Sequence, residues 1–136
     1  MDKFPKSQRL RGRKLIGSLF EEGETMIQHP FKIYYHFEKE IHQPIIRFGI
    51  AVPKKNVRNA CRRNRIKRLV REAFRKSRTD LENFLISDRR RLVIFMIYRG
   101  NINPEYSVIL NKLMIILKRF QKEHETDSGE NLNNGN

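Results

Sequence analysis

The sequence predicts a single α+β domain, a two-layer sandwich in which helices cover a sheet. Three patterns indicate this class. Apolar and polar residues alternate over 31–37 and 45–52, an apolar run without alternation fills 92–98, and apolar residues recur every three or four positions over 58–77 and 104–120. The length of 136 residues suits one modest domain and no second. We expect a helix, strands, a helix, a strand and a last helix in chain order.

The domain is expected to span residues 9–121, between a flexible arm (1–8) and a disordered polar tail (122–136) rich in Asn, Glu and Gly. At its start, apolar side chains at helical spacing predict a helix over Arg13–Glu22, and Gly23 provides the stop at its C-terminus. The chain therefore begins its folded part with a short helix.

Four extended segments follow from the remaining apolar patterns. Residues 25–28 predict a short strand, and the alternation over 31–37 and 45–52 predicts two strands that are each buried mainly on one face. The second face of 45–52 carries small residues, so it is a candidate wall for a groove. Residues 92–98 lack alternation, as expected of a strand covered on both faces.

The positive charge is concentrated in one segment. The chain carries 29 Lys and Arg against 15 Asp and Glu, a formal net charge of +14 at pH 7. Residues 54–78 hold twelve Lys and Arg and the single acid Glu72, which places +11 within 25 residues. Like charges at helical spacing repel one another, so a merely solvated helix face explains this pattern poorly. The segment predicts binding to a polyanion, and to nucleic acid in particular.

Within this basic segment, residues 58–77 are predicted to form an amphipathic helix with Asn56 or Asn59 as its N-cap. One apolar stripe is expected to pack on the sheet, and it consists of Ile66, Leu69, Val70, Ala73 and Phe74. The opposite face is polar and consists of Asn64, Lys67, Arg68, Arg71 and Arg75. A last helix is expected to open at Pro104, because proline is favoured at the first helical position.

The sequence holds no pattern for side-chain catalysis or for metal binding. The four histidines lack zinc-ligand spacing, and the single cysteine, Cys61, has no second thiol. There is no phosphate-binding glycine loop and no nucleophile elbow. We therefore expect neither a catalytic residue nor a metal site in this chain.

The same composition indicates a reducing, aqueous location. A lone cysteine cannot form an intramolecular disulfide, and the charged first twenty residues lack the apolar core of a signal peptide. The longest apolar run has seven residues, whereas a membrane helix needs about 20. We expect a cytoplasmic protein that does not enter the membrane.

Residues 59–72, NACRRNRIKRLVRE, resemble the signature of the protein subunit of bacterial ribonuclease P. The core of that signature is R-N-R-x-K-R-x-x-R, which runs from Arg63 to Arg71 in this chain. The matches together cover residues 9–120, most of the chain. Supporting matches are Arg9-Leu10 before the first helix, Phe20 and Gly23 at its end, and RFGIAVPKK over 47–55.

The resemblance implies a ribosomal-protein-like α-β-β-β-α-β-α fold with a left-handed β-α-β crossover, against the general preference for right-handed crossovers. It also implies a function, namely a ribonucleoprotein endonuclease that removes the 5′ leader from precursor tRNA. In that family the RNA subunit performs the hydrolysis with bound Mg²⁺, and one protein chain accompanies one RNA. The alternative is a non-catalytic ribosomal or ribosome-assembly RNA-binding protein, which the copurifying RNA would distinguish.

The resemblance also implies two sets of site residues. The surface for the ribonuclease P RNA would comprise Lys54, Lys55, Asn59, Arg63, Asn64, Arg65, Lys67, Arg68 and Arg71. The cleft for the precursor-tRNA leader would lie between the first helix and the sheet and would comprise Ile16, Phe20, Tyr34, Ala51, Lys67 and Arg71. An aromatic side chain there would stack on a leader base.

Two departures from the family pattern are visible. Ile16 stands where the family often has a second aromatic residue in the cleft, so an apolar contact replaces one stacking platform. The link from Lys76 to Arg91 is longer than usual and carries three consecutive arginines, Arg89–Arg91, without an assigned contact.

Overall fold

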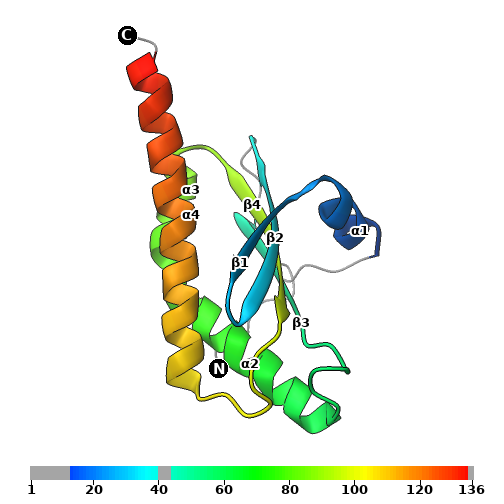
Figure 1. The fold of residues 1–136 in the computed structure, drawn as a ribbon. Coiled ribbons are helices and arrows are strands. Elements are labelled where there is room, and N and C mark those ends of the chain that lie inside the picture. Colours follow the sequence, from blue (N-terminus) through cyan, green and yellow to red (C-terminus); the bar gives the residue numbers. More distant parts are fainter. Residues whose placement is uncertain (1–12, 40–43, 135–136) are drawn as a thin grey trace.

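The computed structural model describes the backbone of residues 13–39 and 44–134 and the side chains of residues 17–39 and 44–122. Its elements are α1 (Arg13–Glu22), β1 (Glu24–Gln28), β2 (Phe31–Glu38), β3 (Ile46–Ala51), α2 (Ala60–Ser77), α3 (Thr79–Ser87), β4 (Arg91–Tyr98) and α4 (Tyr106–Asn134) (Figure 1). The predicted α+β class is confirmed. The first helix, the four strands and the basic helix agree with their predicted bounds to within two residues.

The four strands form one mixed sheet in the order β1-β2-β4-β3. The β1–β2 and β2–β4 pairs are antiparallel, whereas β3 and β4 are parallel, with Phe48 opposite Ile94. Parallel neighbours cannot be joined by a tight turn, so the chain crosses over through α2 and α3. This is the predicted β-α-β unit, and its left-handed sense stays a prediction.

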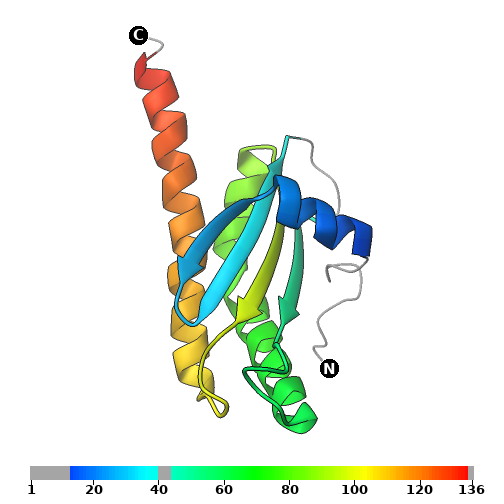
Figure 2. The ribbon, with the colours of Figure 1, turned by 45° about the vertical axis from the view of Figure 1, so that its right-hand side comes forward.

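Helices cover both faces of the sheet, to different extents. The larger core lies between the sheet and α2, α3 and α4, while α1 covers part of the opposite face with Leu19 (Figure 2). The central strand β4 contributes side chains to both cores, because consecutive residues such as Ile94 and Phe95 point to opposite faces of the sheet. This double burial is the physical reason for the apolar run without alternation, and it confirms that prediction.

The connection between α2 and β4, for which no element is predicted, contains a third helix. In α3, Leu81 and Leu85 lie four residues apart and are both buried in the larger core. Asp80 and Glu82 in its first turn interact favourably with the positive end of the helix dipole. The predicted order of elements is therefore corrected by one additional helix, which accounts for the length of the link.

The three arginines after α3 also receive defined positions. The backbone of Arg89 is left-handed, with φ of 55°, and turns the chain towards β4. The guanidinium of Arg90 lies 2.9 Å from the carboxylate of Asp88, and that of Arg91 lies 3.7 Å from the carboxylate of Glu38. Two of these three charges are thus paired within the protein.

The last helix differs from its prediction at both ends. It begins at Tyr106 rather than at Pro104, and its first turn is closed by the Ile109 N–H donating to the Glu105 carbonyl at 3.2 Å. It continues to Asn134, where the sequence predicts a disordered tail from residue 122. Extending an existing helix needs no new nucleus, which favours continuation through a polar segment. The predicted flexible arm, residues 1–8, lies outside the described residues.

None of the helices in the described part of the chain is long and apolar enough to cross a membrane.

Candidate nucleic-acid interface

The basic helix α2 is held in place by its apolar stripe. Ile66, Val70 and Phe74 are fully buried, and Leu69 packs against the same core, as predicted. The ring of Phe74 stacks on that of Phe48 in β3, with 4.1 Å between centroids and 11° between planes. This packing fixes the rotation of α2 about its axis, so the polar residues opposite the stripe have one defined orientation.

The start of α2 is fixed by Asn59, one of the two predicted N-caps. Its backbone is extended, and its Oδ1 accepts a hydrogen bond from the Arg62 N–H at 3.1 Å. Such a cap satisfies one of the amide groups that a helix leaves without an internal partner. The other candidate, Asn56, instead donates from Nδ2 to the Tyr98 carbonyl at 3.3 Å. Asn59 thus has a structural role in addition to its predicted place on the RNA surface.

The predicted RNA-binding residues divide into exposed and half-buried groups. The exposed group consists of Lys54, Lys55, Asn59, Asn64 and Arg68. The half-buried group consists of Arg63, Arg65, Lys67 and Arg71. Asn64, Arg68 and Arg71 recur at intervals of four and three residues, which places them on one side of the helix. These three residues of the set therefore lie on one surface of α2.

Two arginines of this set already bind the protein's own backbone. Arg63 Nη1 donates to the carbonyls of Val57 and Arg58, at 2.9 and 2.8 Å, and so holds the loop between β3 and α2. Arg65 Nη1 donates to Asn103 Oδ1 at 3.1 Å and to the Pro104 carbonyl at 3.3 Å. Each guanidinium has five N–H donors, so these contacts leave donors that can meet a phosphate.

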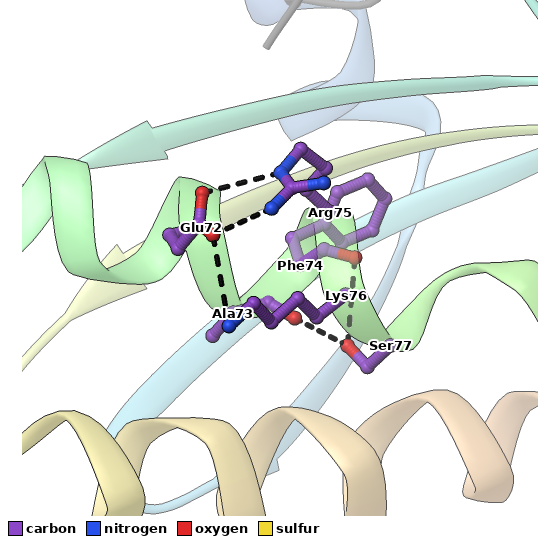
Figure 3. A network of polar contacts seen from close by, with 6 residues as sticks. All are labelled: Glu72, Ala73, Phe74, Arg75, Lys76 and Ser77. Carbon is purple, nitrogen blue, oxygen red and sulfur yellow. Dashed lines mark hydrogen bonds and ion pairs between the residues drawn. The ribbon is translucent and has the colours of Figure 1, made fainter. Parts of the chain in front are cut away.

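The single acid of the basic segment lies near the C-terminal end of α2 (Figure 3). Glu72 forms two hydrogen bonds with Arg75, from Nη2 at 2.6 Å and from Nε at 3.2 Å, and Lys76 Nζ lies 3.9 Å away. The hydrogen bond from Arg75 holds the pKa of Glu72 below its usual value. Arg75, which belongs to the predicted polar face, is thus neutralised by its own helix.

On the opposite face of the sheet, aromatic residues form a second candidate surface beside α1. The Phe20 ring lies 4.6 Å from that of Tyr34 and 5.7 Å from that of Phe95, measured between centroids. Phe20 nevertheless remains 44% exposed, so one ring both packs and faces solvent. Ala51 and Tyr34 pack against the small core of this face. The structure thus places Phe20 against Tyr34, and Ala51 beside the same small core, while their role in leader binding stays a prediction.

The other predicted leader-binding residues are placed differently. Lys67 and Arg71 belong to α2, which packs on the other face of the sheet, so they can reach the α1 face only around the edge strand β3. Ile16 belongs to α1, but its side chain lies outside the described residues.

A cation that was not among the predicted site residues lies next to the aromatic surface. Lys32 Nζ is 5.2 Å from the centre of the Tyr34 ring. In register across the sheet, Lys32 lies between Ile27 of β1 and Ile97 of β4, and Ile27 is 71% exposed. The alternation of 31–37 already places Lys32 and Tyr34 on the same face, and this is the signal that identifies it.

Comparisons with known proteins agree on one family. The family model of ribonuclease P matches residues 4–121. A ribonuclease P protein component from Porphyromonas gingivalis is 32% identical over 106 residues, which is 76% of this chain and 76% of that protein. The solved structure of the Staphylococcus aureus RNase P protein has a TM-score of 0.66 at 27% identity and covers 83% of this chain and 94% of that one. The RNase P protein from Thermotoga maritima has a TM-score of 0.62 at 29% identity and covers 82% of this chain and 96% of that one.

Proposed function

The chain belongs to the ribonuclease P protein family, and from this membership we propose that it is the protein component of a ribonuclease P ribonucleoprotein. In this proposal it binds the catalytic RNA and the 5′ leader of precursor tRNA, and it assists the endonucleolytic removal of that leader. The observation that carries the proposal is the oriented cationic surface of α2, which combines a family-specific sequence with side chains directed away from a deep core.

RNA binding is assigned to α2 and its approach. Exposed Arg68 and Lys55 provide charge for phosphate oxygens, and exposed Asn64 provides an amide for a sugar or a base edge. An α-helix cannot read the deep, narrow major groove of A-form RNA, so we expect contacts with the backbone of a folded junction. About five phosphate contacts would weaken binding by roughly two to three orders of magnitude between about 50 and 200 mM salt.

Leader binding is assigned to the aromatic surface beside α1. The half-exposed Phe20 ring and the adjacent Tyr34 offer a platform for a base, and Lys32 adds a cation for a phosphate. Lys67 and Arg71 approach this surface around the β3 edge in the proposal. Stacking on an aromatic side chain tolerates any base, which suits leaders of varied sequence.

The hydrolytic step is assigned to the RNA subunit. Over side chains 17–39 and 44–122, no three His, Cys, Asp or Glu converge into a set that could hold a metal ion. We therefore derive no metal-dependent step on this chain. The Mg²⁺ of the reaction is assigned to the RNA, with one protein chain per RNA.

Reconstitution tests the proposal. The full chain is combined with the ribonuclease P RNA of the organism that encodes it and with a 5′-labelled precursor tRNA. We expect faster leader removal than with RNA alone at low Mg²⁺, with cleavage at the mature 5′ end. No acceleration under these conditions would contradict the proposal. A variant with Asn64→Ala and Arg68→Ala should lose much of the acceleration. The control Lys118→Ala, which also removes one positive charge but from an exposed position on α4, should keep it.

A further inference from the structure

A depression of about 660 Å³ lies at one end of the sheet, outside both surfaces described above. Its walls come from the turn between β1 and β2, the end of β4, the loop that follows β4, and the first turns of α4. We call it the β4–α4 depression. Its size falls within the range of sites that hold a small molecule or a single chemical group of a larger one.

The floor and the rim of the β4–α4 depression differ in character. The floor is apolar, with Tyr98, Pro104 and Ile109 all buried. The rim carries the cations Arg99 and Lys112, and exposed His29, Asn101 and Asn103 add polar groups. Among the described residues, Glu105 is the only carboxylate in the lining. An apolar floor beneath cations and amides suits a base with its phosphate, because each part meets a chemically matched group.

Hydrogen bonds and close packing hold the depression in shape. The Arg99 N–H donates to the Pro30 carbonyl at 2.7 Å, and the Tyr98 hydroxyl donates to the Asn101 carbonyl at 2.7 Å. A Cβ on Gly100 would lie only 2.5 Å from the Tyr98 hydroxyl oxygen and 2.7 Å from Pro30 Cβ. Only glycine fits there, so the loop packs directly on the end of the sheet. The site is therefore preformed.

The β4–α4 depression is connected to α2 by side-chain contacts. Arg65 of α2 donates to Asn103 Oδ1 and the Pro104 carbonyl, and both residues line the depression. Asn56, in the loop before α2, donates to the carbonyl of Tyr98 in its floor. These contacts set the depression at a fixed position relative to the cationic helix. The aromatic surface beside α1, in contrast, lies on the other face of the sheet.

We infer that the β4–α4 depression receives an unpaired nucleotide of the same RNA subunit that binds α2. This inference rests on the proposed function. Arg99 and Lys112 would contact the phosphates on either side of the nucleotide. Its base would pack on Val108, the exposed apolar side chain of the lining, above buried Tyr98 and Ile109, with its edge towards the Asn101 and Asn103 amides. Proteins recognise RNA sequence mainly at such unpaired positions.

Site-directed cleavage of RNA tests the position. Cys61 is the only cysteine and is exposed on α2, so a thiol-linked iron chelate on the native chain reports the RNA near α2. The same chelate on a Cys61→Ser, Asn101→Cys chain reports the RNA near the depression, and a Cys61→Ser, Lys122→Cys chain is the remote control. We expect Asn101→Cys to cut the ribonuclease P RNA at nucleotides distinct from those cut from Cys61, and Lys122→Cys to cut weakly.

The outcomes separate this inference from the proposed function. Cleavage from Cys61 without cleavage from Asn101→Cys would overturn the inference and leave the proposed function standing. Cleavage of precursor tRNA alone from Asn101→Cys would also overturn it, because the occupant would then be the substrate. Absence of RNA cleavage from both positions would contradict the proposed function itself.

Affinity measurements test the chemistry of the depression. An Arg99→Ala, Lys112→Ala chain should bind the ribonuclease P RNA about tenfold more weakly near physiological salt, with a salt slope reduced by about 1 to 2. The matched control, Lys118→Ala with Lys122→Ala, removes the same charge from the other part of α4 and should change affinity by less than about twofold. Equal effects of the two variants would show a general charge effect and overturn the inference. Thermal melting verifies that both variants fold.

Discussion

The cationic surface of α2 and the aromatic surface beside α1 lie on opposite faces of one sheet. The hydrophobic cores beneath these two surfaces differ in size. The helix α2 rests on the larger core, together with α3 and α4. Helix α1 rests on a small core of Leu19, Val93 and Phe95. Charged side chains act over several ångströms, whereas stacking requires contact. The larger core therefore fixes the orientation of the whole cationic surface of α2. The small core under α1 leaves the Phe20 ring able to adjust to a base.

The difference between the two cores is tested most directly by replacing one leucine in each core with alanine. Leu85→Ala in the larger core should lower the free energy of unfolding by about 3 to 5 kcal/mol, because a closed core cannot collapse around the cavity. Leu19→Ala in the small core should cost about 2 to 3 kcal/mol, because α1 can move towards the sheet. Chemical denaturation measures both values. Equal losses would remove the distinction between the two cores.

The aromatic surface should respond to truncation with a loss that depends little on salt. Phe20→Ala should weaken binding of precursor tRNA by the holoenzyme by about 1 to 3 kcal/mol, because a stacking platform is lost. The comparison ligand is mature tRNA without a leader, whose affinity should not change. Phe20→Leu serves as the control for apolar packing. An equal loss for both ligands would place Phe20 outside the leader site.

Substitutions in the cationic surface should instead change the salt dependence of RNA binding. Arg68→Ala should reduce the slope of log affinity for the ribonuclease P RNA against log salt by about 0.7 to 0.9, and should cost roughly 1 kcal/mol at physiological salt. Arg68→Lys should retain most of the slope, because the charge remains. Arg68 is the cleanest position for this test because its side chain is exposed. An unchanged slope for Arg68→Ala would exclude a phosphate contact at this residue.

The smallest expected effect concerns the neutralised end of α2. Since Arg75 holds the pKa of Glu72 below its usual value, the pair stabilises the fold above the unfolded pKa near 4.5 and loses this contribution as pH falls through the folded value. The side chain of Glu72 is 39% exposed, so screening limits the effect to less than about 1 kcal/mol. Melting temperatures of the native chain and Glu72→Gln should therefore differ at pH 7 and converge as the pH falls below the folded pKa of Glu72. A constant difference would contradict this assignment.

The periodic parts of the fold were predictable from the sequence because each reflects one physical period. The stripe from Ile66 to Phe74 follows the helical repeat, and the burial of 31–37 follows the strand repeat. Helix α3 was not predicted, although Leu81, Phe84 and Leu85 recur at helical spacing and all contribute to the larger core. This apolar stripe spans little more than one helical turn, which is too short for periodicity to distinguish a helix from a loop.

The site was predictable in its location and less so in the roles of its residues. Charge density and the family signature identify α2, and the structure places Asn64, Arg68 and Arg71 on one side of it. The backbone contacts of Arg63 and Arg65 were not predictable, because Arg65 meets Asn103 and Pro104, which lie almost forty residues away in the chain. Substitution of Arg65 therefore affects a loop position as well as any RNA contact. The β4–α4 depression was not predictable for the same reason, because its walls combine residues 29–30 with residues 98–112.

The position of β4 at the centre of the sheet has a consequence for how the protein is made. During translation, β1, β2, β3 and α2 leave the ribosome before β4, yet β4 separates β2 from β3 and fills both cores. The α4 residues that close the larger core extend to Phe120. A nascent chain that ends before β4 carries the complete basic segment without the strand that joins β2 to β3, and one that ends within α4 lacks part of the larger core. The orientation of the basic segment by the folded domain therefore requires the synthesis of both β4 and α4.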